Sequence, residues 1–256
     1  MILSCLAIAL AAALAAAAAW LLFDIRKKGI AIGMPVLLGL ACMAIGYVGA
    51  SALLLVANAV VSAFASVSFI EHEAAAFYLA LTTGALVGLA MFVMLKKPLA
   101  QRRSAYETLA FGIGVVLPML VYKVVDVVLV NVSYILLGAE YGESALLLLN
   151  SVVGLALTLP EVFLAVLLAS LLNRNKALTG LIVTLACETA VYAAQSVRDA
   201  FGAPDFIGPV AGVLALTAVA VYDARAWSSF PPVKKPSRAR GSNQKIPWPE
   251  PGEDGR

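Results

Sequence analysis

Long stretches without a charged residue constrain this chain more than any other feature. The longest covers residues 30–66, and six further apolar runs are separated by short polar breaks. An α-helix rises about 1.5 Å per residue, so about 20 apolar residues cross the hydrocarbon core of a bilayer. Irregular backbone cannot face lipid, and the runs are too long for barrel strands. The sequence therefore predicts an all-α fold, a polytopic bundle of transmembrane helices.

The composition excludes a water-soluble enzyme. Hydrophobic residues make up 62% of the chain and charged residues 13%, whereas soluble domains have roughly 45–50% and about 25%. So little polar surface cannot cover a globule of 256 residues. The net charge of +3 is too small to indicate a nucleic-acid partner. Cys5, Cys42 and Cys187 lie in apolar runs without metal-ligand spacing, which is typical of small buried side chains.

The apolar runs predict about seven spans. They cover residues 2–23, one helix within 30–66, and then 74–95, 109–136, 146–172, 178–194 and 206–221. The stretch 30–66 exceeds one crossing by about fifteen residues. Either its helix is long and tilted, or residues 50–66 form a separate interfacial or half-membrane piece. If that piece crosses fully, the chain has eight spans.

Basic residues at alternate breaks predict the orientation. They cluster at residues 26–28, 96–103 and 174–176, whereas the intervening breaks are acidic or balanced. Positive residues favour the cytoplasmic side, so we expect the amino terminus outside and the carboxyl terminus in the cytoplasm. The first run lacks a basic segment before it and therefore predicts a retained span of the cell membrane, not a secretion signal.

The chain divides into a transmembrane domain, residues 1–223, and a tail, residues 224–256. The tail holds six of the twelve prolines and seven basic residues, so it is predicted to be extended or disordered in the cytoplasm. Its basic residues would meet anionic head groups. Its aromatic residues Trp227, Phe230 and Trp248 would lie at the membrane interface or in the groove of another membrane subunit.

Four ionisable residues fall inside predicted spans: Lys123, Asp126, Glu161 and Glu188. Placing a charged side chain at the centre of a bilayer costs about 2.5–3.5 kcal/mol. Each of these residues therefore needs a structural or functional explanation. Counting depth from the loops places Lys123, Glu161 and Glu188 at similar levels, with Asp126 one turn away. This predicts one intramembrane polar cluster in which a carboxyl holds a proton. The cluster would form a proton or ion path or a metal site, or else consist of interhelical ion pairs that orient the bundle.

The only histidine stands in the acidic turn Glu71, His72 and Glu73. On a helix these side chains diverge by about 100° per residue, so they cannot all ligate one metal. We expect a solvated turn at the outer interface. The chain also lacks a phosphate-binding loop, a nucleophile elbow and a CxxC pair. No catalytic set, metal site or cofactor is predicted.

Three segments carry a family resemblance: EAAAFYLA at 73–80, ETLAFGIG at 107–114 and PEVFLAVLLAS at 160–170. They resemble elements of the YhfC-type intramembrane metalloproteases, relatives of the membrane-embedded prenyl-protein proteases. The resemblance implies a metal-dependent protease with a Glu-Glu and arginine element followed by spans that carry histidine. Here Glu73 and Glu161 match the family's acids.

Most of the family's functional positions are replaced. Ala74 occupies the position of the second acid, Phe77 that of the arginine and Val115 that of a histidine. Val162 and Ala169 occupy the positions of a later arginine and histidine. A metal would lack its nitrogen ligands.

Because no set of residues for chemistry is complete, the prediction leans away from an enzyme. We expect an integral membrane protein that is a non-catalytic subunit or scaffold of a membrane complex, with the lipid bilayer and other membrane subunits as partners. One alternative is a proton- or ion-coupled transport element that uses the buried acids. The other is a divergent or decayed intramembrane metalloprotease.

Overall fold

The computed structural model describes residues 2–65, 74–100, 104–137, 160–201 and 230. Within these ranges the chain consists of helices joined by short turns, with no strand. The predicted all-α fold is therefore confirmed. The helices are α1 (Ile2–Lys27), α2 (Gly33–Ala65), α3 (Ala74–Lys96), α4 (Ala105–Leu137), α6 (Pro160–Asn173) and α7 (Ala177–Phe201).

Four helices are long and apolar enough to cross a bilayer, namely α1, α2, α3 and α4. The apolar parts of α6 and α7 in the described region are shorter, Val162–Asn173 and Ala177–Ala193. The chain thus has the helices of an integral membrane protein. Seven spans and the orientation of the termini stay predictions, because the predicted span 206–221 and the first half of 146–172 lie outside the described residues.

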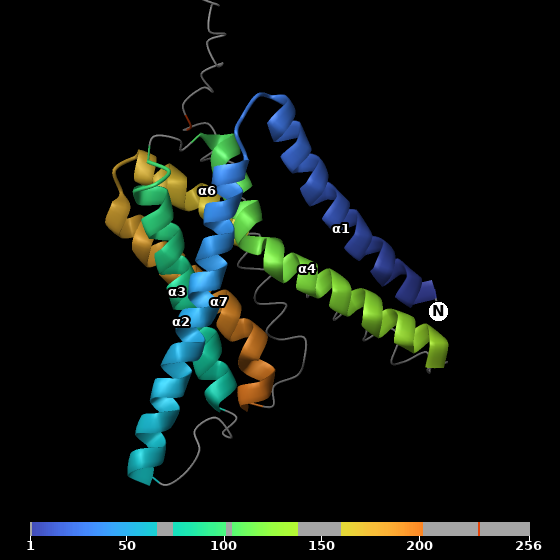
Figure 1. The fold of residues 1–256 in the computed structure, drawn as a ribbon, viewed down its shortest axis with the longest axis vertical. Helices are drawn as coiled ribbons and strands as arrows, with labels where there is room; N and C mark the ends of the chain where they lie inside the picture. The colour runs from blue at the N-terminus through green and yellow to red at the C-terminus, as the bar shows by residue number, and fades with distance from the viewer. Residues whose placement is uncertain (1, 66–73, 101–103, 138–159, 202–229, 231–256) are drawn as a thin grey trace, which may run out of the picture.

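The long uncharged stretch forms one helix. α2 continues without interruption from Gly33 to Ala65, so residues 50–65 extend the same helix and do not form a separate piece. Its 33 residues reach about 50 Å, well beyond the ~30 Å hydrocarbon core. The end of α2 projects past its neighbours (Figure 1), and Leu55, Val56 and Phe64 there are exposed. A helix of this length must tilt or emerge from the bilayer.

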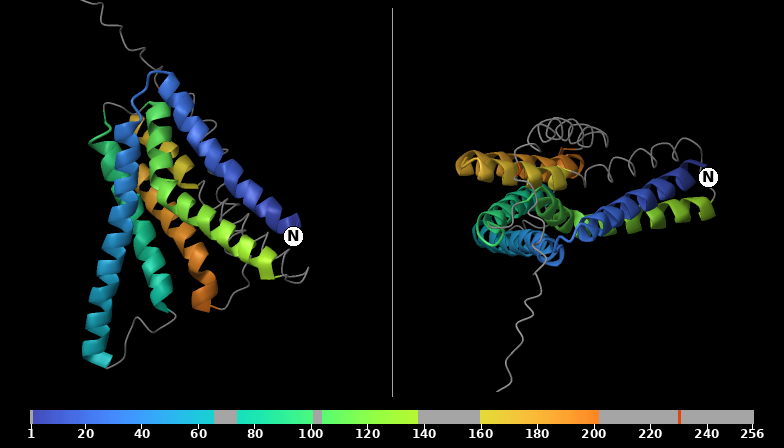
Figure 2. Two further views of the ribbon diagram at one scale, coloured as in Figure 1. Left: turned by 45° about the vertical axis from the view of Figure 1, so that its right-hand side comes forward. Right: turned by 90° about the horizontal axis from the view of Figure 1, so that it is seen from above.

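The helices form two arms that meet at one end. In the first arm α2, α3 and α7 pack together, with α6 against α7. In the second arm α1 runs along α4 (Figures 1 and 2). α4 begins against α2 and α6 and then turns away from them (Figure 1). Pro118 lies inside α4 and lacks the N–H for its helical hydrogen bond, which is the usual cause of such a bend.

Glycines allow the closest helix contacts. A Cβ on Gly39 of α2 would collide with the carbonyl oxygen of Phe111 in α4, and a Cβ on Gly114 of α4 would collide with that of Val36. A Cβ on Gly84 of α3 would lie 2.7 Å from the carbonyl oxygen of Glu188 in α7. Lipid offers no hydrophobic force to drive helices together, so small residues that let backbones approach are the means of packing.

A polar clip joins α1 to the start of α4. Lys28 Nζ lies 2.7 Å from Asp24 Oδ2, donates to Tyr106 Oη at 3.4 Å and sits 4.4 Å from the centre of the Tyr106 ring. At the same end, Ser104 caps the start of α4. Its Oγ accepts from the Glu107 N–H at 3.3 Å, and its hydroxyl donates to Glu107 Oε2 at 2.8 Å. Both contacts set the point from which α1 and α4 run together.

Candidate functional site

A buried polar stripe on α7 is the main concentration of polar side chains among the described helices. Thr184, Glu188 and Tyr192 are spaced four residues apart and therefore share one face. Their exposed fractions are 1%, 0% and 4%. The face points toward α3 and α2, so these polar groups lie inside the first arm and not toward lipid.

The carboxyl of Glu188 is held where α3 comes closest to α7. The Glu188 Cγ would lie 3.4 Å from a Cβ on Gly88, and its carbonyl oxygen faces Gly84. The missing side chain at Gly84 lets the backbones of α3 and α7 approach each other at Glu188. Buried Cys42 of α2 and half-buried Cys187 of α7 belong to the same apolar core as Tyr192.

Tyr192 ties the same stripe to α2. Its hydroxyl donates to the sulfur of Met43 at 3.1 Å, and its ring meets that of Tyr47 edge-on with centroids 6.4 Å apart. On the α3 side, the hydroxyl of buried Thr83 donates to the Leu79 carbonyl at 2.7 Å within its own helix. The hydroxyls are thus engaged with neighbouring atoms of the bundle.

Lys123 and Asp126 lie elsewhere. Both belong to the second arm, on the part of α4 beyond Pro118, where Asp126 is exposed and Lys123 half-buried. Nζ of Lys123 is 5.7 Å from the ring centre of Tyr122, and no ion pair joins Lys123 to Asp126 in the described structure. This part of α4 packs on α1 through Val127, Ala7 and Ala11.

The structure therefore brings Glu188 into a packed interior but does not bring Lys123 and Asp126 to it. The bend of α4 directs these two residues into the other arm, although their depths along the chain match. Glu161 lies in the first turn of α6, and its side chain is outside the described part. Glu71, His72 and Glu73 also lie outside the described residues. No group of three or more potential metal ligands occurs among the side chains that are described.

One residue of the predicted tail contacts the bundle. Phe230 is half-buried and packs against the main apolar core, which includes Met91, Leu95 and Leu168. Trp227 and Trp248 lie outside the described residues. Phe230 thus contacts the core of the helical bundle.

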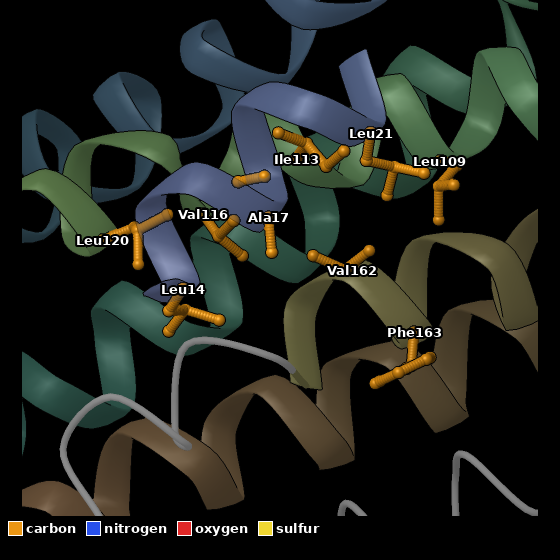
Figure 3. A pocket seen from close by; sticks show the side chains of 10 residues that line it. Leu14, Ala17, Leu21, Leu109, Ile113, Val116, Leu120, Val162 and Phe163 are labelled. Carbon is orange, nitrogen blue, oxygen red and sulfur yellow. The ribbon is translucent and has the colours of Figure 1, made fainter. Parts of the chain in front are cut away.

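An apolar cavity lies between the arms where α1, α4 and α6 meet. It has a volume of about 220 Å³, and every lining residue in the described part of the chain is aliphatic or aromatic. Figure 3 shows Ala17, Ile113 and Val162 facing it from the three helices. None of its described lining residues is ionisable, and none belongs to the polar stripe on α7.

Sequence reasoning identified Glu188 but missed its companions. Thr184 and Tyr192 carry a visible signal, since both are polar and lie one helical turn on either side of Glu188. Met43 and Cys42 carry none, because apolar residues of α2 reveal nothing about which helix they meet.

Comparison with known proteins adds no relative. A scan against models of protein families, a search of curated proteins and a search of solved structures each found no match to this chain.

Proposed function

We propose that this integral membrane protein is a non-catalytic subunit or scaffold of a membrane complex. The observation that carries the proposal is the position of Glu188, which is fully buried where α7 contacts Gly84 and Gly88 of α3. Glu188 occupies a contact between helices, and Lys123 and Asp126 of α4 lie in the other arm. An acid in such a contact serves helix packing.

The exposed half of α2 supports the proposal. This helix is longer than a bilayer needs, and its last turns lie beyond the packed part of the first arm. Leu55, Val56 and Val60 are exposed there, together with half-buried Asn58. A helix from another subunit would find an apolar surface there against which it could pack.

The test is affinity purification of the full chain from native membranes in mild detergent, followed by mass spectrometry. We expect stoichiometric membrane partners. Deleting residues 231–256, which keeps Phe230, should release partners that dock on the tail. Val56→Trp should release partners that dock on α2, whereas Trp20→Leu on exposed α1 serves as the control. A clean monomer from wild-type membranes would contradict the proposal.

A second candidate is a proton-coupled element centred on Glu188. It is favoured by the complete burial of the carboxyl between Thr184 and Tyr192, because an ionisable group inside a membrane domain is a common site of proton binding. Here Glu188→Gln should abolish proton flux in liposomes, and Asp126→Asn, which changes an exposed acid of the second arm, should leave it intact. Equal flux for wild type and Glu188→Gln would eliminate this candidate.

A further inference from the structure

The cavity between α1, α4 and α6 has the shape and chemistry of a lipid site. We propose that it holds one acyl chain of an anionic phospholipid, whose head group lies at the basic end of α1. This binding site is independent of the scaffold function, since it uses neither Glu188 nor the tail.

The walls of the cavity accept hydrocarbon only. Small residues Ala17 and Ala18 leave the hollow on α1, and Ile113 and Val116 of α4 form the opposite wall. A water molecule needs two to four polar partners, and none of the lining side chains that the structure describes offers one. For helices inside a bilayer, the hydrocarbon at hand is the tail of a lipid.

The depth of the cavity matches one leaflet. Leu14 is its deepest residue along α1 and Leu21 its shallowest, and Lys28 follows seven residues after Leu21. At about 1.5 Å per residue, the path from Leu14 to Lys28 measures about 20 Å. Half of a bilayer with its head groups is about 20–22 Å thick. A chain that reaches Leu14 therefore leaves its head group beside Lys28.

The charge at this end suits an anionic head group. This end of α1 carries three basic residues, Arg26, Lys27 and Lys28, and one acid, Asp24. Asp24 pairs with Lys28 at 2.7 Å. In the part of the chain that the structure describes, neither Arg26 nor Lys27 forms an ion pair, and both are exposed. Their charges thus remain for a phosphate. The clip between Lys28 and Tyr106 lies above the cavity, one turn beyond Leu109 of its wall.

The proposal is tested by native mass spectrometry of the full chain after reconstitution in vesicles of equal phosphatidylglycerol and phosphatidylcholine. The wild type should retain one phosphatidylglycerol in preference to phosphatidylcholine. Arg26→Gln and Lys27→Gln, both on the surface, should each reduce this preference by roughly fivefold. Ala18→Phe should fill the cavity and remove the retained lipid.

Ala19→Phe is the matched control, because Ala19 is exposed on α1 and does not line the cavity. It should retain lipid like the wild type, and circular dichroism should show equal helix content in all variants. Equal retention of the two lipids by the wild type would overturn the proposal, since the head group would then be irrelevant. Equal loss in Ala18→Phe and Ala19→Phe would overturn the assignment to this cavity.

Discussion

The contact between α3 and α7 yields a quantitative prediction from two glycines one turn apart. A Cβ on Gly84 would lie 2.7 Å from the Glu188 carbonyl oxygen and 2.8 Å from Thr189 Cα, both backbone atoms that cannot rotate away. A Cβ on Gly88 would lie 3.3 Å from the Thr184 carbonyl oxygen. Ordinary contact begins at 3.4 Å, so the helices must part by 0.7 Å (3.4 minus 2.7) for Gly84→Ala and by 0.1 Å (3.4 minus 3.3) for Gly88→Ala.

The comparison isolates packing from helix propensity. Both substitutions replace glycine by alanine inside the same helix, so the intrinsic gain in helix stability, about 1 kcal/mol in water, cancels between them. Forcing extra volume into a packed contact costs typically about 1–3 kcal/mol. We therefore expect the free energy of unfolding of Gly84→Ala to be about 1–3 kcal/mol below that of Gly88→Ala.

The measurement is reversible unfolding in mixed micelles by increasing fractions of sodium dodecyl sulfate, followed by circular dichroism. Thermal unfolding in mild detergent supplies a second readout, in which Gly84→Ala should melt first. If both variants have the same free energy of unfolding, or if Gly84→Ala is the more stable, then α3 and α7 do not approach as closely as this packing requires.

Three further predictions concern single contacts. Tyr192→Phe removes the hydroxyl that donates to the Met43 sulfur and should reduce the free energy of unfolding by about 0.5–1.5 kcal/mol in the same micelle assay; no change would mean that the contact contributes nothing. Phe230→Ala should speed tryptic cleavage of the tail, because the side chain packs against the core, and a cleavage rate like that of the wild type would contradict this attachment. The Asp24 carboxylate and Tyr106 raise the pKa of Lys28 above 10.5. A raised pKa stabilises the fold while lysine is protonated, so melting temperature should be insensitive to this pair from pH 7 to about pH 9. Above pH 10.5 the melting temperature should fall more steeply for the wild type than for Asp24→Asn. If the two proteins show parallel pH profiles, Lys28 and Asp24 do not stabilise the fold.

Much of the secondary structure follows from the sequence alone. The predicted run 74–95 became α3 (Ala74–Lys96), and 109–136 became α4 (Ala105–Leu137). The physical reason is that lipid offers no hydrogen-bond partners. An apolar run of this length therefore forms an α-helix, in which backbone N–H and C=O groups pair within their own segment. The length of an uncharged run therefore sets the length of a helix. The length of the run does not show whether it forms one helix or two. The stretch 30–66, which contains α2, therefore allowed two interpretations.

The arrangement of those helices needed the tertiary structure. A helix that is apolar on every side has no stripe that marks its buried face. The hydrophobic pattern therefore predicts neither which face of the helix is buried nor which helix it contacts. Depth counting put Lys123 and Glu188 at one level, yet the bend of α4 and its packing on α1 separate them. Conversely, Gly84 and Gly88 acquire meaning only because Glu188 lies opposite them. The composition of the chain determines that it forms helices in lipid. The close contact between the backbones of α3 and α7 places Glu188 in the interior.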